Sequence, residues 1–460
     1  MTPLSPKAVS APGKVFLAGG YLVLDRNYTA LVFGLDARIH VCIEPIQTNS
    51  GVTLSEIIVR SPQFKEATWE YGYRLTEQDG GIGVTQLRAS HDLPLNRNPF
   101  IQTSLTYALT YISSHVPHHL IQPSQISILA SSSYYSNHGH PPSPTTPFHA
   151  YDVPLHHAHK TGLGSSAALV TSFTAALLSH YLPKSIFDLS SDSSLRILHN
   201  LAQASHCAAQ GKVGSGFDIA SAVYGSCLYR RFSPSILSSA PDPGTPQFAT
   251  KLKVLVEDSE HVWDTEIQKS AIKMPAGLRL VMCDVDCGSE TPGMVKQVLA
   301  WRKENMEEAD EIWKALQRGN EELARELTRL ATEDAGPGDK YAKLREIIKA
   351  NRGLIRKMSV ASKVPIEPPQ QTALLDACSN IPGVIGGVVP GAGGYDAIVL
   401  LVEDKQSVHI ELKKLTAGWK VDAASDDGVK IGRVGILGIR EDMVGVRVQD
   451  PADYKEWIAA

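Results

Sequence analysis

The sequence contains little cysteine, and its cysteines form no recognisable pattern. The six residues are scattered along 460 positions with no CxxC pair: Cys42, Cys207, Cys227, Cys283, Cys287 and Cys378. This spacing favours reduced, mostly buried side chains in a cytoplasmic protein over a disulfide framework or a zinc site. No apolar run reaches the roughly 18 residues of a membrane span, and the N-terminus lacks the basic-then-apolar pattern of a secretion signal. We therefore expect a cytoplasmic protein without a membrane partner.

Neither sign of charge is in large excess. Lys plus Arg number 44 against 48 Asp plus Glu, which gives a formal net charge of −4. This balance argues against nucleic acid or an anionic membrane as the main partner, although it leaves room for a local basic pocket. With 43% hydrophobic and 20% charged residues the composition is that of an ordinary globular chain, and its length is sufficient for several domains.

Common nucleotide-binding signatures are also missing. No GxxxxGK[ST] run and no protein-kinase set of glycine loop and HRD segment occurs, which excludes P-loop NTPases and protein kinases. Gly162-x-Gly164-x-x-Ala167 does fit the dinucleotide fingerprint. A Rossmann unit, however, needs an apolar strand before the glycines and a strand ending in an acid about 20 residues later. Here the flanking segments are the polar runs PLHHAHKTG and KSIFDLSSDSS, so a Rossmann fold is not expected.

What the sequence does have is a glycine turn that leads directly into a helix, KTGLGSSAALVTSFTAALLSHYL at residues 160–182. From Ser165 to Leu182 there is no Gly or Pro, and apolar residues recur at helical spacing until Pro183. Ser165 and Ser166 then lie at the helix N-terminus, where free N–H groups and the helix dipole favour an anion such as phosphate. Ser165 could instead be a plain helix cap, but the paired glycines favour phosphate binding.

Three segments resemble the GHMP kinases, small-molecule kinases named after galactokinase, homoserine kinase, mevalonate kinase and phosphomevalonate kinase. They are AHKTGLGSSAALVTS at 158–172, SAPGKVFLAGGYLVLD at 10–25 and PGAGGYDAIVLLV at 390–402, and together they span nearly the whole chain. Within the family, AGGYLVLD, AQGKVGSGFDIASAVYGS at 209–226 and CGSETPGMV at 287–295 are most similar to fungal members that act on phosphomevalonate.

The resemblance implies an α+β protein of two domains with the active site between them. Residues 1–232 would form a ribosomal-protein-S5-like, ATP-binding domain, and residues 233–460 a ferredoxin-like α/β-sandwich domain. The residues themselves also favour α+β, because strand and helix patterns are interspersed without a regular βαβ repeat. Four prolines in SPSILSSAPDPGTPQ, residues 233–247, predict an exposed loop at a boundary near Phe232. We expect a monomer or weak homodimer.

Local patterns predict strand, turn and strand over 10–25, strands between 32 and 77, and a helix over 98–114. The strand-like run LRLVMCDVD is followed by a charged, amphipathic helical block over 293–332 and by another helix over 340–357. Residues 131–159 are poor in apolar residues and rich in Ser, Pro and His, which predicts a long surface loop. The histidines of this loop have no regular ligand spacing and are interpreted as solvated rather than metal-binding: His138, His140, His149, His156, His157 and His159.

The resemblance also implies the ATP site. The phosphates would be bound by the phosphate loop, which comprises Lys160, Gly162, Leu163, Gly164, Ser165, Ser166 and Ala167. Ser166 would ligate Mg²⁺ through its hydroxyl, with ATP oxygens and water as the other ligands. Mevalonate kinase relatives place an acidic magnesium ligand a few turns before Asp218, but LAQASHCAAQ at 201–210 contains no carboxylate. A second protein ligand is therefore not identified.

Lys14 and Asp218 are the implied catalytic residues. Lys14 would neutralise phosphate charge, although a lysine in this setting could also be a snorkelling surface side chain. Asp218 follows a second glycine-rich turn, where it could be a helix cap, a general base or a positioning residue. A phosphate monoester has a second pKa near 6, so its attacking oxygen is already largely ionised at neutral pH. That favours positioning over proton removal.

The implied contacts of the acceptor substrate come from several segments of the chain: Lys14, Tyr21, Ser215, Ser289, Thr291, Gly393 and Gly394. Packing is nearly as good an explanation for Tyr21. Ser289 and Thr291 precede a helix and either hold the acceptor phosphate or cap that helix. Gly393 and Gly394 would permit a close turn against the phosphates rather than take part in the chemistry.

The expected reaction is transfer of a phosphoryl group from MgATP to the phosphate of (R)-5-phosphomevalonate, a step of the mevalonate pathway to isoprenoids and sterols. Catalysis would consist mainly of positioning and charge neutralisation. Two alternatives remain open at this point. One is another kinase of the family, such as one acting on the neutral hydroxyl of mevalonate. The other is a non-catalytic sensor, of which the family has examples.

Overall fold

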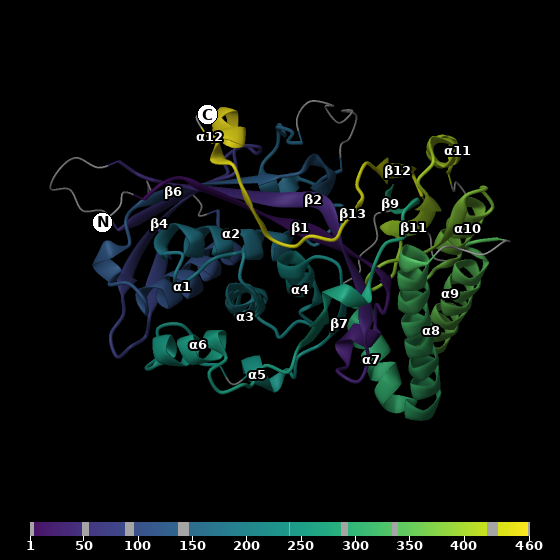
Figure 1. Ribbon diagram of the computed structural model, residues 1–460, viewed down its shortest axis with the longest axis horizontal. Helices are drawn as coiled ribbons and strands as arrows, with labels where there is room; N and C mark the ends of the chain where they lie inside the picture. The colour runs from purple at the N-terminus through teal and green to yellow at the C-terminus, as the bar shows by residue number, and fades with distance from the viewer. Residues whose placement is uncertain are drawn as a thin grey trace.

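The computed structural model describes residues 4–47, 55–87, 96–136, 147–238, 240–286, 293–333, 339–420 and 431–458. In this part of the chain the strands form two sheets with helices packed against them (Figure 1). The larger sheet has the order β14-β1-β2-β6-β3-β4-β5, with β7 and β13 pairing with β2 and β8 pairing with β7. The smaller sheet has the order β10-β11-β9-β12 and its pairs are antiparallel.

The larger sheet comprises β1 (Lys7–Ala18), β2 (Ala30–Pro45), β3 (Glu56–Arg60), β4 (Thr68–Leu75), β5 (Ile82–Gln86), β6 (Ser124–Ala130), β7 (Cys227–Arg230), β8 (Glu266–Gln268), β13 (Glu441–Asp442) and β14 (Arg447–Gln449). The smaller sheet comprises β9 (Leu278–Asp286), β10 (Val384–Val388), β11 (Ala397–Glu403) and β12 (Arg433–Leu437). Most pairs are antiparallel, but β3 runs parallel to β6, so the larger sheet is mixed.

The helices fall into two groups along the chain. The first group is α1 (Pro99–Ser113), α2 (Ser165–Tyr181), α3 (Asp192–Gln210), α4 (Phe217–Tyr224), α5 (Ser235–Ser238) and α6 (Phe248–Glu257). The second is α7 (Met294–Glu304), α8 (Met306–Thr332), α9 (Ala342–Ser362), α10 (Pro369–Ser379), α11 (Gln406–Gly418) and α12 (Lys455–Ile458). No helix among the described residues combines the length and the apolar character needed to cross a bilayer.

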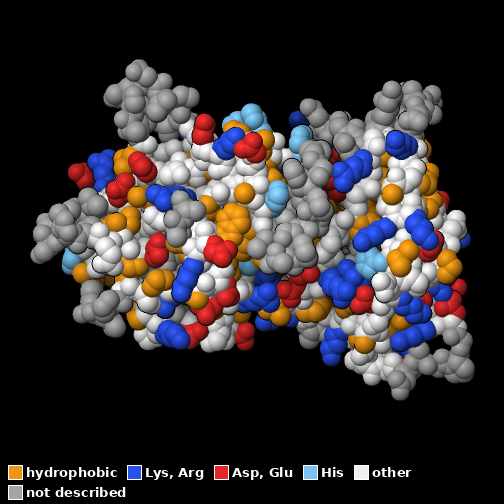
Figure 2. Space-filling model, turned by 90° about the horizontal axis from the view of Figure 1, so that it is seen from above, with side chains coloured by type: hydrophobic (Ala, Val, Ile, Leu, Met, Phe, Trp, Pro, Cys, Tyr) orange, Lys and Arg blue, Asp and Glu red, His pale blue; other side chains and the backbone are white. Residues whose placement is uncertain are grey.

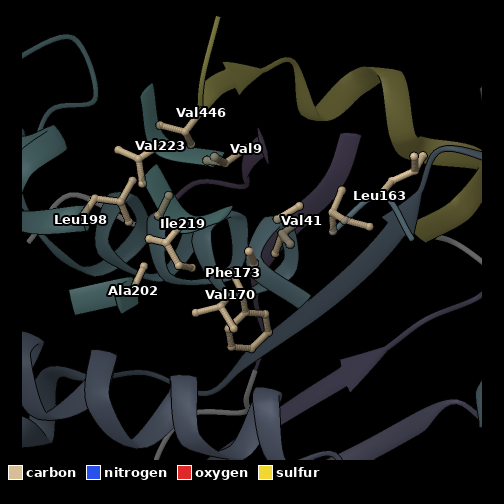
Figure 3. Close-up of a cluster of buried hydrophobic side chains, with 14 of the residues drawn as sticks. Val9, Val41, Leu163, Val170, Phe173, Leu198, Ala202, Ile219, Val223 and Val446 are labelled. Carbon is tan, nitrogen blue, oxygen red and sulfur yellow. The ribbon is translucent and has the colours of Figure 1, made fainter. Parts of the chain in front are cut away.

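Helix α2 lies at the centre of the first group. It is buried on nearly all sides, as expected for a helix without Asp, Glu, Lys or Arg, and it packs against β1, β2, α1, α3 and α4. Figure 3 shows this core, where side chains of α2 meet those of α3, α4 and the first two strands: Val9, Val41, Val170, Phe173, Leu198, Ala202, Ile219 and Val223. The helix after the phosphate loop is therefore a central core element, and the predicted helix over 98–114 is confirmed as α1.

The second strand expected within residues 10–25 is wrong. β1 ends at Ala18, and the chain then forms a 3-10 turn, η1 (Leu22–Leu24), in which Val23 N–H donates to the Gly19 carbonyl at 3.1 Å. Tyr21 joins an apolar cluster with residues of α7 to α9, whereas Val23 joins one with β1 and β7. The tight turn sends neighbouring apolar side chains into two different clusters, which the residue pattern alone does not reveal.

The expectation of a surface loop over 131–159 is only partly right. Tyr134, Tyr135 and Phe148 are buried, and Tyr135 packs edge-on against Phe64, with ring centroids 4.9 Å apart. Aromatic residues spaced along the segment therefore anchor it to the core. Of its histidines, His156 and His157 are exposed, while His138 and His140 lie outside the described residues.

The second half of the chain matches the predicted α+β class, with long helices against the small antiparallel sheet (Figure 1). Two separate helices, α7 and α8, occupy the predicted charged block, and both are amphipathic. Lys and Arg are interspersed with Asp and Glu over the face seen in Figure 2, in keeping with the balanced composition. The two-domain division at residue 232 stays a prediction. Beyond it, α6 packs against α3, and β8, β13 and β14 join the larger sheet.

The segment from β13 to β14, which we call the C-terminal strap, passes very close to the first half of the chain. A Cβ on Gly445 would lie 2.0 Å from the Val223 carbonyl oxygen, and one on Gly225 would lie 2.2 Å from that of Met443. Only glycine fits at both positions. The strap is therefore threaded against α4 with no room for side chains at these two crossings.

Arg38 binds the C-terminal strap through several hydrogen bonds. Its buried guanidinium donates to the Asp442 carboxylate at 2.9 Å, to the Ser10 hydroxyl at 2.8 Å and to the carbonyls of Val444 and Gly445. Burial lowers the pKa of Arg38 to about 10, so the guanidinium remains charged at neutral pH. One buried cation thus connects β1, β2 and the strap.

Arg38→Met should lower the free energy of unfolding by about 3–5 kcal/mol, because it leaves the Asp442 carboxylate and two strap carbonyls without their donor. Urea unfolding monitored by circular dichroism measures the change. Arg447→Met is the matched control: Arg447 lies 3.9 Å from the same carboxylate, but its side chain is 48% exposed, so its loss should cost less than about 1 kcal/mol. Equal losses for the two variants would contradict the role given to Arg38.

Candidate active site

The phosphate loop rests directly on β1. The Lys14 backbone N–H donates to the Leu163 carbonyl at 2.9 Å, and Lys14 Nζ donates to the Gly162 carbonyl at 3.3 Å. Gly13 makes this approach possible, since a Cβ there would lie 2.8 Å from the Leu163 oxygen. Gly164 then takes the left-handed conformation, with φ 78°, and becomes the N-cap of α2. Lys14 and the loop glycines are therefore held in fixed positions relative to one another.

The start of α2 is left without a side-chain cap. The N-cap is Gly164, which has no side chain to accept from the first turn of the helix, so the plain capping role considered for Ser165 is wrong. Ser165 and Ser166 are partly buried, and a Cβ on Gly162 would meet nothing within 4 Å. The first turn of a long helix thus has no side-chain cap from its N-cap residue and follows a glycine with open space beside it, an arrangement that suits an anion.

The other predicted phosphate-loop residues have different surroundings. Leu163 and Ala167 are buried, with only about 1% of their surface exposed, so their side chains hold the loop against the core. Lys160 is exposed, and its backbone forms an isolated bridge with that of Tyr135. A contact between the Lys160 side chain and a nucleotide stays a prediction.

Lys14 and Asp218 approach each other from different elements. Lys14 Nζ lies 5.6 Å from the centre of the Phe217 ring at the start of α4, and Asp218 is the next residue. Burial lowers the pKa of Lys14, and the charge of Asp218 partly offsets this effect. Within the described residues Lys14 forms no ion pair closer than 4.0 Å. Its ammonium group is therefore a partly desolvated cation beside the phosphate loop, where attraction to an anion is strong.

The glycine-rich turn before Asp218 is held by two side chains, those of the buried Tyr229 and the half-buried Arg231. Tyr229 donates its hydroxyl to the Ser215 carbonyl at 2.7 Å, and Arg231 donates to the Gly214 carbonyl at 3.0 Å and the Leu24 carbonyl at 2.8 Å. Burial lowers the pKa of Arg231. Nothing in the sequence around Arg231 separates it from a surface arginine, so this residue could not be identified from the sequence.

The third glycine segment, at residues 390–394, packs against the end of β1. Tyr21 is buried and donates its hydroxyl to the Ala392 carbonyl at 2.7 Å, and burial raises the pKa of this phenol. A Cβ on Gly20 would lie 2.5 Å from the Gly391 carbonyl oxygen. The structure thus gives Tyr21 a packing role that ties the two halves of the chain together.

The substrate contacts inferred from the resemblance are only partly placed by the described residues. Gly394 donates its backbone N–H to the Ile366 carbonyl at 3.1 Å. A Cβ on Gly393 would lie 2.3 Å from the oxygen of the same carbonyl, so a side chain does not fit at this position. Substrate contacts of Tyr21, Ser215, Gly393 and Gly394 stay predictions, and Ser289 and Thr291 lie outside the described residues.

A histidine that the sequence analysis did not single out contacts the predicted magnesium ligand. His206 is buried on α3, and its Nε2 lies 3.2 Å from the Ser166 Oγ. It belongs to the segment 201–210, in which a carboxylate rather than an imidazole was the expected ligand. The helical spacing could have placed His206 on the buried face of α3, but not against Ser166.

The described residues are compatible with a magnesium ion that is carried by a nucleotide. They contain no group of three or more His, Cys, Asp or Glu side chains that could hold a metal. Mg²⁺ usually keeps several waters and binds through substrate phosphates with few protein ligands. The Ser166 hydroxyl, at the uncapped start of α2, can supply one such oxygen.

Comparisons with known proteins agree with this geometry. A family model described as GHMP kinases N terminal domain matches residues 150–226. The chain is 53% identical over 458 residues to phosphomevalonate kinase ERG8 of Gibberella zeae, covering 98% of both chains. It is 48% identical to phosphomevalonate kinase erg8 of Aspergillus fumigatus, covering 100% of both.

Among solved structures, the fold is similar to that of Streptococcus pneumoniae phosphomevalonate kinase in complex with phosphomevalonate and AMPPNP. The TM-score is 0.60 at 18% identity, and the match covers 94% of this chain and 99% of the other. Methanococcus jannaschii mevalonate kinase is also similar, with a TM-score of 0.53 at 16% identity, 95% of this chain and 99% of the other being covered. At these identities the likeness shows the fold alone.

Gly164→Ala should weaken binding of a nucleoside triphosphate about tenfold more than Gly162→Ala, as measured by calorimetric titration. Both positions have positive φ, 78° and 75°, so each alanine costs about 1 kcal/mol in backbone strain. Only at Gly164 does the new Cβ also fall 2.9 Å from Lys14 Cε, so that Lys14 must move. Equal losses in the two variants, with thermal unfolding confirming that both fold, would contradict the coupling of Lys14 to the loop.

Proposed function

Because this chain belongs to the GHMP kinase family, we propose that it transfers the γ-phosphoryl group of ATP to (R)-5-phosphomevalonate, giving (R)-5-diphosphomevalonate and ADP. The reaction is a step of the mevalonate pathway of isoprenoid and sterol biosynthesis. The observation that carries the proposal is 53% identity, over 98% of both chains, to a relative named phosphomevalonate kinase. The cation and helix terminus at the phosphate loop suit transfer between two phosphate groups.

The donor side of the reaction rests on α2 and Lys14. The uncapped N–H groups of α2 bind the phosphates of ATP, and the glycines of the loop let the backbone approach them. Lys14, partly desolvated between the loop and Phe217, offsets the repulsion between the two anionic reactants. The Ser166 hydroxyl would hold Mg²⁺ together with ATP oxygens, and the ion would supply further charge neutralisation. Most of the rate enhancement then comes from positioning and electrostatics.

The acceptor side rests on the start of α4. Asp218 Oδ1 accepts a hydrogen bond from the backbone N–H of Ile219 at 3.0 Å. The charge of Asp218 raises the pKa of Lys14. We assign Asp218 to positioning Lys14 and the acceptor rather than to proton removal, since a phosphate monoester is already largely ionised at neutral pH. The same proposal places the protein in the cytoplasm, as a monomer or weak dimer.

A coupled assay of ADP release with mevalonate, phosphomevalonate and diphosphomevalonate tests the function directly. We expect kcat/KM for phosphomevalonate to exceed that for mevalonate at least a hundredfold, because the neutral hydroxyl of mevalonate makes no use of the cations arranged for a second anion. Lys14→Met is the control for contaminating kinases and should lose about 10²–10³ in kcat. Preference for mevalonate would favour the alternative kinase, and no ADP from any acceptor would favour a sensor.

Asp218→Asn should retain far more activity than Asp218→Ala. The amide keeps a hydrogen-bonding oxygen of the same shape for the Ile219 N–H, whereas alanine loses it. Asp218 raises the pKa of Lys14, so in the Asn variant Lys14 should lose its proton at a lower pH than in the wild type. The alkaline decline in activity should therefore begin at a lower pH in this variant. Steady-state rates across the alkaline range measure both effects. If the Asn and Ala variants are equally inactive at every pH, Asp218 acts as a general base instead.

A further inference from the structure

His206 lies between the two glycine-rich turns of the site. Its Nε2 is 3.2 Å from Ser166 Oγ at the start of α2 and 3.3 Å from Gln210 Nε2, one turn further along α3. Gln210 in turn lies beside the turn that leads to Asp218, since a Cβ on Gly214 would be 3.5 Å from Gln210 Oε1. The C-terminal part of α3 therefore connects the phosphate loop with the turn that carries the predicted catalytic aspartate.

The imidazole has little freedom to leave this position. His206 is about 2% exposed, and its ring lies 5.7 Å from that of Phe100, centre to centre. The Gln210 amide N–H and the Ser166 hydroxyl can both donate to Nε2, so in the tautomer with an unprotonated Nε2 its single lone pair is shared between these two donors. The Ser166 hydroxyl then donates its proton toward α3. The lone pairs of the Ser166 oxygen are left for a partner on the other side.

We propose that His206 is a positioning residue that holds the Ser166 hydroxyl with its oxygen toward the cation of the bound nucleotide. The proposal rests on the proposed function of the chain as an ATP-dependent kinase. A neutral imidazole does this without adding a negative charge beside the triphosphate. Binding of a second anionic reactant nearby is therefore not penalised by an extra carboxylate.

Two substitutions that mimic different halves of the imidazole test this role. In His206→Gln the side-chain amide reaches about as far as Nε2, whereas in His206→Asn it reaches only about as far as Nδ1 and cannot contact Ser166. Binding of AMPPNP is measured by calorimetry with Mg²⁺ and with EDTA. We expect His206→Asn to weaken binding about three- to tenfold in Mg²⁺ and to have no effect in EDTA, and His206→Gln to bind as the wild type does.

Ser166→Ala provides the matched background, since the proposal has His206 acting only through Ser166. In that background His206→Asn should cause no further loss of affinity, and thermal unfolding should confirm that each variant folds. Equal losses for Gln and Asn, a loss that persists in EDTA, or losses that simply add to that of Ser166→Ala would overturn the proposal. A wild type that binds MgAMPPNP but does not turn over phosphomevalonate would refute the acceptor assignment and leave the His206 test intact.

Discussion

The hydrogen bonds between β1 and the phosphate loop are the constraint on which the rest of the site depends. β14 pairs only with residues 8–10 of β1, and further along the strand Lys14 binds the loop through both its backbone and its side chain. The same residue thus fixes the loop that leads into the start of α2 and supplies a cation beside it. Gly13 and Gly164 keep the intervening space free of Cβ atoms. A shift of the loop would displace the ammonium group with it, so the two features cannot be adjusted separately.

The cations around the site are held by neutral groups. Lys14 donates to a backbone carbonyl, and Arg231 donates to the carbonyls of Leu24, Val213 and Gly214. Elsewhere in the molecule buried or half-buried arginines face carboxylates, as Arg352 does with Glu367 at 2.7 Å. A carbonyl fixes a cation without cancelling its charge, whereas a carboxylate partner cancels most of it. Asp218 acts on Lys14 only through its longer-range charge, so the positive charge of Lys14 is offset in part and the remainder is available where two anionic reactants would meet.

Local sequence patterns were sufficient for the glycine turn before α2, for α2 itself and for the class of fold. Paired glycines and a long uninterrupted helical repeat are properties of neighbouring residues, so they can be identified without knowledge of tertiary contacts. The features that the sequence did not predict depend on contacts between residues far apart in the chain. The turn after Gly20 depends on apolar clusters from both halves of the chain. The contact of His206 with Ser166 spans 40 residues, and that of Arg231 with Leu24 spans 207. Helical periodicity identifies the buried face of α3, but not what that face meets.

The C-terminal strap has a consequence for how the chain is made. Ala8 pairs with Gln449, so the first strand leaves the ribosome long before its neighbour exists. At synthesis rates of roughly 5–20 residues per second, that interval is on the order of tens of seconds. Until then β1 is an open edge, able to pair with another nascent chain. We therefore expect newly made molecules to need shielding by chaperones until the last residues have been translated.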